Sequence, residues 1–129
     1  MSDKIQIVLV DDHPLFRAGV AYTLTAEPDM EVAGQGASAA EAVQLAQELL
    51  PDLILLDLNM PGKDGREILR EIKADNRFHH IPTIVFTTSS SVRDKQMVYD
   101  LGANCFITKP DTFNKLIEMT TSISKLWLQ

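Results

Sequence analysis

Side chains that could handle a phosphoryl group follow several short apolar runs of the sequence. Asp11 and Asp12 follow the run Ile-Val-Leu-Val, and Asp57 follows Leu-Ile-Leu-Leu. Thr87 comes after the run Thr-Ile-Val-Phe, and Lys109 comes after Cys-Phe-Ile-Thr. Phosphoryl transfer needs positioned charges and donors, because its transition state spreads negative charge over the equatorial oxygens. Three carboxylates, a hydroxyl and an ammonium supply such a set, and a carboxylate held in line can act as the nucleophile, a role we assign to Asp57.

The apolar runs are typical of buried strands in a parallel sheet, because they are short, leucine-rich or β-branched, and bounded by polar residues. The carboxyl ends of parallel strands meet at one edge, where open α/β sheets bind their ligands. Helical patterns alternate with the strand-like runs. The sequence therefore predicts an α/β fold with a five-stranded parallel sheet covered by helices on both faces, its strands lying near 7–10, 30–33, 53–56, 81–86 and 104–107.

The helical segments carry their own start and stop signals. Pro14 suits the first turn of a helix, and Ser38 with Glu41 three positions later forms a capping-box pattern. Gly102 is the expected stop of the fourth helix. Apolar spacing predicts the inward faces of three helices: Leu15 or Phe16, Val20 and Leu24; Val43, Ala46, Leu49 and Leu50; and Phe113, Leu116, Ile117, Thr120, Ile123 and Trp127.

Composition limits the function classes that fit the chain. Its 129 residues are expected to form one domain, and its net charge of -6 disfavours direct binding to nucleic acid. No apolar stretch approaches the roughly 20 residues that a membrane helix requires. A single cysteine cannot form an internal disulfide. We therefore expect a cytoplasmic protein that contacts neither a membrane nor nucleic acid.

A cluster of three aspartates would repel itself unless a cation were bound among them. Mg²⁺ suits such a site, because it accepts one or two carboxylates, keeps several waters and leaves room for phosphate oxygens. Each residue also has an ordinary interpretation. Asp11 and Asp12 could be loop acids, Thr87 a helix cap or strand residue, and Lys109 a solvated lysine.

The histidines are interpreted as outside the metal site. His13 is expected to frame the first helix together with the proline that follows it. His79 and His80 lack a third ligand nearby in the sequence, and a tetrahedral site needs more.

Taken together, these motifs resemble the receiver domain of two-component response regulators over essentially the whole chain. The resemblance rests on Asp11-Asp12, Asp57, Met60-Pro61-Gly62, Asp64-Gly65, Thr87, Gly102-Ala103 and Lys109-Pro110. It implies the strand order 2-1-3-4-5 of a doubly wound, flavodoxin-like (βα)5 fold. It also implies a single receiver domain over residues 1–129, with no output domain in the chain.

The resemblance assigns roles within the site. Asp57 would be the phosphoacceptor, taking its phosphoryl group from a phosphohistidine on a sensor histidine kinase or phosphotransfer protein. Mg²⁺ would be held by Asp12, Asp57 and the backbone carbonyl of Asn59, while Asp11 would assist through water. Lys109 would pair with the phosphoryl group and Thr87 would hydrogen-bond it. The peptide bond that precedes Pro110 would be cis, as in the family.

The resemblance also implies a switch and a decay rate. Phe106 stands at the family's aromatic switch position, although it would serve equally as a core residue. The affected surface would comprise the fourth helix, fifth strand and fifth helix, where a downstream protein or a second copy would bind. Asn59 and Ser89 stand at rate-tuning positions, and Thr88 is grouped with them. Catalysis would be limited to the domain's own phosphorylation and dephosphorylation.

Other functions fit less well. A phosphatase using an aspartyl phosphate would carry an acid/base aspartate two positions after its nucleophile, where this chain has Asn59. A pseudo-receiver that only binds proteins would lack one of the five site residues, and none is missing. Asp12-His13-Pro14 resembles receivers joined to helix-turn-helix DNA-binding domains. The region 87–109 resembles stand-alone regulators, including those paired with phytochrome-like kinases, and we expect a stand-alone regulator.

Overall fold

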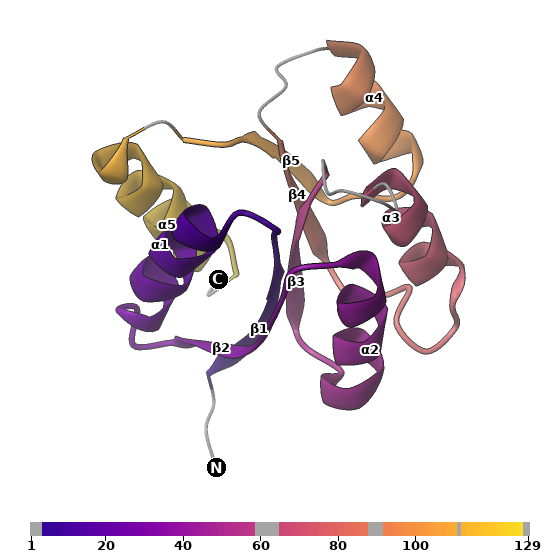
Figure 1. Ribbon diagram of the computed structural model, residues 1–129, viewed down its shortest axis with the longest axis horizontal. Coiled ribbons are helices and arrows are strands. Elements are labelled where there is room, and N and C mark those ends of the chain that lie inside the picture. The colour runs from indigo at the N-terminus through magenta and orange to yellow at the C-terminus, as the bar shows by residue number, and fades with distance from the viewer. Residues whose placement is uncertain (1–3, 59–64, 88–91, 111, 128–129) are drawn as a thin grey trace.

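The strands and helices alternate along the chain in a computed structural model that describes residues 4–58, 65–87, 92–110 and 112–127 (Figure 1). The strands are β1 (Ile5–Val10), β2 (Met30–Gly36), β3 (Leu53–Asp57), β4 (Thr83–Thr87) and β5 (Cys105–Thr108). The helices are α1 (Pro14–Thr25), α2 (Ala39–Leu49), α3 (Gly65–Ala74), α4 (Val92–Asp100) and α5 (Phe113–Trp127). The strands form one parallel sheet in the order β2-β1-β3-β4-β5, so the predicted fold is confirmed.

Helices cover both faces of the sheet. Helices α1 and α5 lie on one side, and α2, α3 and α4 lie on the other (Figure 1). The central strands alternate between the two cores: Ile7 and Leu9 join the core under α1 and α5, whereas Val8 and Val10 join the core under α2 to α4. Because both faces are buried, these strands read as continuous apolar runs rather than as alternating patterns.

Strand register brings the polar ends of the strands to one edge of the sheet. Val10 of β1 pairs with Leu56 of β3. The residues that come next are Asp11 and Asp57, so both follow the same level of the sheet. Strand β4 ends at Thr87, which pairs with Thr108, the residue before Lys109. The edge predicted from the sequence is therefore where the candidate side chains converge.

Local signals fix the ends of several elements. Helix α1 begins at Pro14, and the Ser38 hydroxyl caps α2 by accepting the Glu41 backbone N–H at 3.3 Å. The Glu41 carboxylate accepts from the Ala37 backbone N–H, one residue before the position expected for a capping box. Gly102 follows α4 with φ +105°, a conformation that glycine adopts without strain.

Some helix faces differ from those predicted. The predicted face of α1 left Leu15 or Phe16 open, and Phe16 packs inward whereas Leu15 is 90% exposed. The face of α2 differs from the prediction. Leu49 and Leu50, predicted to face inward, are 40% and 60% exposed. Leu49 is the last residue of α2, and Leu50 follows it in a left-handed conformation with φ 44°. Leu45 instead packs against the core beside α2.

Strand β2 is longer than predicted, because its glycines continue the pairing instead of ending it. Gly34 and Gly36 pair with β1. A Cβ at Gly34 would lie 2.9 Å from a methyl of Leu45, so glycine allows the close approach of α2.

The cis peptide bond expected before Pro110 is not observed. The described part of the chain contains no cis peptide bond, which corrects that expectation. The trans form is the ordinary one, because it is favoured by about 0.5–1 kcal/mol even before proline.

Among the described residues, no helix combines the length and apolar character needed to cross a bilayer.

Candidate functional site

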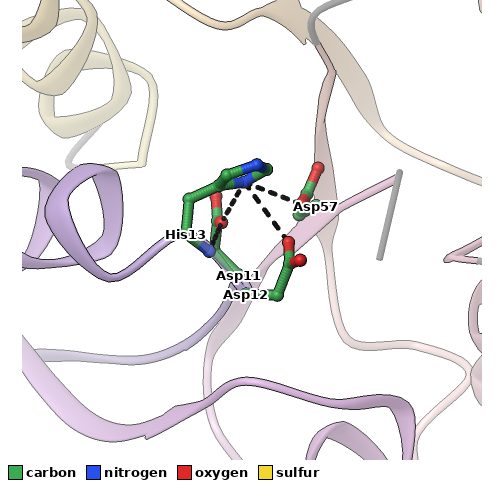
Figure 2. A group of neighbouring side chains, drawn as sticks. All are labelled: Asp11, Asp12, His13 and Asp57. Atoms are coloured by element: carbon green, nitrogen blue, oxygen red, sulfur yellow. Dashed lines mark hydrogen bonds and ion pairs between the residues drawn. The ribbon is translucent and has the colours of Figure 1, made fainter. Parts of the chain in front are cut away.

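Three carboxylates meet at the carboxyl edge of the sheet. Asp11 follows β1 and Asp57 ends β3, and the two side chains are 0% and 1% exposed. Asp12 is partly exposed at the mouth of this cluster. Potential ligand atoms of Asp11, Asp12, His13 and Asp57 all lie within 4.8 Å of one another (Figure 2). The predicted convergence of Asp11, Asp12 and Asp57 is thus observed.

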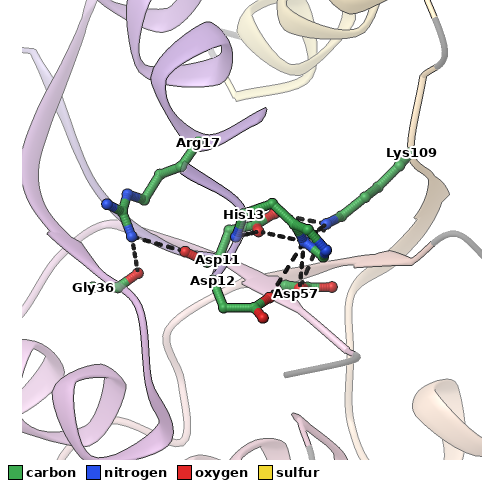
Figure 3. A network of polar contacts seen from close by, with 7 residues as sticks. All are labelled: Asp11, Asp12, His13, Arg17, Gly36, Asp57 and Lys109. Carbon is green, nitrogen blue, oxygen red and sulfur yellow. Dashed lines mark hydrogen bonds and ion pairs between the residues drawn. The ribbon is translucent and has the colours of Figure 1, made fainter. Parts of the chain in front are cut away.

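Lys109 supplies a positive charge to this cluster, as its position after β5 predicts. Its Nζ lies 2.9 Å from Asp11 Oδ2 and 3.5 Å from Asp57 Oδ2 (Figure 3). The side chain is only 7% exposed, and its ammonium lies 4.6 Å from the centroid of the Phe16 ring. Burial strengthens these charge interactions, because little water remains to screen them.

Arg17 ties the loop that carries the aspartates to the neighbouring strand. Its Nη1 donates to the Asp11 carbonyl oxygen at 2.9 Å and lies 3.5 Å from the Gly36 carbonyl oxygen (Figure 3). The sequence interpretation missed this residue. A signal was present, because Arg17 lies one helical turn after His13 and can therefore reach back to the loop.

The His13 ring lies at the mouth of the cluster, so the interpretation of His13 only as a frame for the first helix was incomplete. His13 does occupy the N-cap position of α1, with no capping bond from its side chain. Its ring Nδ1, however, lies 3.2 Å from Asp11 Oδ1, 3.3 Å from Asp12 Oδ1 and 3.8 Å from Asp57 Oδ2 (Figure 2). The only sequence signal was its place directly after the aspartate pair.

Thr87 and Phe106 lie where the sequence predicts. Thr87 is buried at the end of β4, and its carbonyl oxygen accepts the Lys109 backbone N–H at 2.7 Å. Phe106 is half-buried and packs against the core under α2 to α4. Its backbone N–H donates to the Tyr99 hydroxyl at 3.2 Å. The packing of Phe106 suits a core residue, and its switching role stays a prediction.

Three predicted tuning positions, Asn59, Thr88 and Ser89, lie outside the described residues, as does the Met60-Pro61-Gly62 turn.

The described residues fit a divalent cation. Asp11 Oδ2 and Asp12 Oδ1 are buried oxygens that receive no hydrogen bond within the described part of the chain. Their contacts at close range are an ion pair between Asp11 Oδ2 and Lys109 and an approach of the His13 ring to Asp12 Oδ1 at 3.3 Å. Buried anionic oxygens need compensating charge or donors, and oxygen ligands of this kind suit Mg²⁺. The donor set therefore agrees with the expected cofactor class without identifying the ion.

Comparison with known proteins decides the family. The family model described as the response regulator receiver domain matches residues 7–121. The chain belongs to the response regulator receiver family. This receiver domain therefore combines the family's fold with an acidic pocket formed by Asp11, Asp12 and Asp57.

Curated relatives are response regulators of two-component systems. The nitrate/nitrite response regulator protein NarL of Escherichia coli (strain K12) is 38% identical over 84% of this chain and 49% of its own length. Response regulator Rcp1 of Synechocystis sp. (strain PCC 6803) is 46% identical over 61% of this chain and 54% of its own length. The receiver thus spans about half the length of the curated relatives it matches.

Solved structures share the fold closely. The phosphorylated cyanobacterial phytochrome response regulator RcpA superposes with a TM-score of 0.86 at 35% identity, covering 98% of this chain and 95% of that chain. The Mn²⁺-bound form of Rcp1 superposes with a TM-score of 0.84 at 35% identity, covering 97% and 95% of the two chains.

Proposed function

We propose that this receiver is a phosphorylation-activated signalling switch, with Asp57 accepting the phosphoryl group. The observation that carries the proposal is the convergence of three carboxylates and the Lys109 ammonium at one edge of the sheet. Asp57 is buried at that point, with Lys109 Nζ 3.5 Å from its Oδ2. The donor would be a phosphohistidine on a sensor histidine kinase or a phosphotransfer protein.

The reaction needs one nucleophile and several charge-stabilising groups. An oxygen of Asp57 attacks phosphorus and forms a P–O bond, while the P–N bond breaks and its electron pair stays on the donor imidazole. Lys109 pairs with the transferred group, and the Thr87 hydroxyl donates to one of its oxygens. Bound Mg²⁺ would neutralise charge on the phosphoryl oxygens, and we assign its ligands to Asp12, Asp57, the Asn59 carbonyl and, through water, Asp11.

The product is an acyl phosphate, which water hydrolyses in the same site. We propose that Asn59, Thr88 and Ser89 influence the access of that water and so the lifetime of the phosphorylated state. In this proposal the receiver catalyses only its own phosphorylation and dephosphorylation.

The output would be a change of protein-binding surface. We assign it to α4, β5 and α5, with Phe106 on β5 as the side chain that repacks when Thr87 moves toward the phosphoryl group. The downstream partner would be a protein or a second copy of the receiver. The net charge of -6 disfavours direct contact with nucleic acid. A cytoplasmic location stays an expectation.

A second candidate is the receiver portion of a longer DNA-binding regulator. It is favoured by the coverage of only 49% of NarL. The intact mass of the protein purified from its natural source distinguishes the two. A mass near 14.4 kDa supports the stand-alone regulator, and a mass about twice as large supports the longer one.

Acetyl phosphate tests the proposed function without a kinase. With Mg²⁺ present, we expect intact-mass spectrometry to detect one added phosphoryl group per chain. Chelation by EDTA should abolish the addition, and so should Asp57→Asn, because an amide is not a nucleophile of this kind. Undiminished labelling of Asp57→Asn would contradict the assignment of Asp57.

A further inference from the structure

We propose that His13 is an additional protein ligand of the metal site and biases that site toward first-row transition ions over Mg²⁺. The ions concerned are Mn²⁺, Co²⁺, Ni²⁺ and Zn²⁺, which accept imidazole nitrogen. This inference rests on the proposed function, because it concerns the same metal site. It adds a residue and a specificity to that site.

The spacing of the atoms supports the proposal. Ligand atoms held about 2.1 Å from one ion stand about 3.0–3.4 Å apart when they are neighbours in octahedral or tetrahedral geometry. His13 Nδ1 lies 3.3 Å from Oδ1 of Asp12, a proposed direct ligand, which is inside that range. It lies 3.2 Å from Oδ1 of Asp11, the carboxylate assigned to the ion through water. Asp57 Oδ2 lies slightly farther from Nδ1, at 3.8 Å. The imidazole nitrogen thus lies at ligand spacing from Asp12 and within 4 Å of Asp57, close enough to bind the same ion.

The backbone holds His13 at the site. Its N–H donates to Asp11 Oδ1 at 2.7 Å, so the residue is fixed beside the carboxylate that its ring also contacts. The side chain makes no capping bond at the start of α1, so its nitrogens are not needed by the helix. The side chain is 56% exposed, which places the ring at the mouth of the cluster rather than in its packed floor.

Lys109 and His13 approach different oxygens of Asp11. The ammonium pairs with Oδ2 at 2.9 Å, whereas the ring faces Oδ1 at 3.2 Å. The ammonium also lies 3.1 Å from His13 Nδ1. Lys109 therefore keeps its ion pair with Asp11 Oδ2 when His13 Nδ1 binds a cation instead of contacting the ammonium.

Ligand chemistry gives the expected direction of selectivity. Mg²⁺ prefers oxygen ligands and keeps its waters, so an added imidazole contributes little to its binding. First-row transition ions bind imidazole well, and the affinity of a nitrogen-containing site rises from Mn²⁺ through Co²⁺ to Ni²⁺. Removing His13 should therefore weaken Ni²⁺ binding far more than Mg²⁺ binding.

The other histidines of the chain can be substituted, so that metal binding by the His13 imidazole is measured alone. The chain contains three histidines, and the other two are His79 and His80, whose rings lie 5.9 Å apart in a loop. The double variant His79→Ala/His80→Ala leaves His13 as the only imidazole. Dissociation constants for Ni²⁺ and Mg²⁺ are measured by calorimetry in this background, and again after adding His13→Ala or the closer mimic His13→Asn.

We expect both His13 substitutions to lower the preference for Ni²⁺ over Mg²⁺ by about tenfold or more. Ni²⁺ should also broaden the proton signals of the single remaining imidazole in NMR spectra. An unchanged preference for Ni²⁺ over Mg²⁺ would overturn the inference. So would an equal decrease of both dissociation constants in the His13 variants, because it would show that the ring hinders metal binding. If Asp57 is still labelled by acetyl phosphate with Mg²⁺ in that case, only the role of His13 fails. If acetyl phosphate does not label Asp57 and no divalent ion binds, the proposed function is contradicted as well.

Discussion

Lys109 is the side chain on which the charge balance of the site depends. Its ammonium is nearly buried and contacts the carboxylates of both Asp11 and Asp57. A buried ion pair contributes little net stability, but removing one partner leaves the other charge without compensation. The site is therefore more sensitive to the loss of this cation than a surface ion pair would be.

We expect Lys109→Met to lower the free energy of unfolding by about 3 kcal/mol in the absence of divalent ions. The matched control is Lys125→Met, because Lys125 is exposed on α5 and its loss should change stability by less than about 0.5 kcal/mol. Urea unfolding followed by circular dichroism measures both. An equal decrease of the unfolding free energy in the two variants would show that the ion pairs of Lys109 matter no more for stability than an exposed lysine.

Cys105 offers a second test on a single side chain. Burial raises the pKa of the Cys105 thiol, although a backbone hydrogen bond at Phe106 and the charge of Lys95 act in the opposite direction. Less thiolate is then present at neutral pH than in an unfolded chain. Because the folded pKa is raised, the thiol's contribution to stability is fully present below the unfolded pKa. That contribution is lost as pH rises through the folded pKa.

Alkylation by iodoacetamide should accordingly be slower in the native protein than in urea, and the native rate should climb as pH increases. Mass spectrometry of timed samples gives the rates. Native and urea-unfolded protein reacting equally fast at neutral pH would be inconsistent with the partly buried position of Cys105.

Single side chains also show what the sequence could and could not predict about the site. Asp57, Thr87 and Lys109 were predictable because each stands at or just after the end of a strand, and parallel strands bring their ends together. His13 was not, because its only signal was its place directly after the aspartate pair. Arg17 carried a signal, since it lies one helical turn after His13, but its hydrogen bond to the Asp11 carbonyl oxygen depends on how α1 directs that side chain back toward the loop.

Helix α5 shows the same limit for an element. Three-to-four spacing predicted an inward face containing Leu116, Ile117, Thr120 and Ile123. In the structure Ile117 is 42% exposed, whereas Ile123 is 1% exposed and belongs to the core beneath α1 and α5. Spacing identifies a stripe, but its edge depends on how the helix is rotated against the sheet and α1, which the sequence does not specify.

The two isoleucines of α5 give a matched pair of substitutions. We expect Ile123→Ala to cost about 2–4 kcal/mol of unfolding free energy, because it removes buried methyl groups and leaves a cavity. Ile117→Ala should cost less than about 1 kcal/mol, since that side chain is partly in water already. Thermal and urea unfolding compare them. A cost for Ile117→Ala as large as that for Ile123→Ala would contradict the observed orientation of α5.

For the domain as a whole, topology was the most predictable feature. Apolar runs alternating with amphipathic segments determine the α/β class, and the resemblance to the receiver family supplied the strand order. The length of β2 was less predictable, because Gly34 and Gly36 read as strand terminators. In the structure both glycines pair with β1, and the missing side chain at Gly34 leaves room for Leu45 and Leu49 of α2.

Binding of Mg²⁺ should stabilise the entire domain. A ligand that binds only the folded state adds about 2.7 kcal/mol at a concentration of 100 times its dissociation constant. Asp12→Asn should remove most of this gain by weakening the site. Thermal unfolding with and without MgCl₂ tests this, and NaCl of equal ionic strength controls for screening of the net charge of -6. An equal rise with NaCl would show that the effect is not site binding.

The most direct measurement locates the phosphoryl group on the chain. After reaction with acetyl phosphate and Mg²⁺, sodium borohydride reduces an aspartyl phosphate to homoserine, and peptide mass spectrometry identifies the altered position. We expect homoserine at position 57 and unchanged aspartate at positions 11 and 12. Phosphorylated protein with aspartate intact at position 57, or with homoserine at another position, would contradict the assignment of Asp57 as the phosphoacceptor.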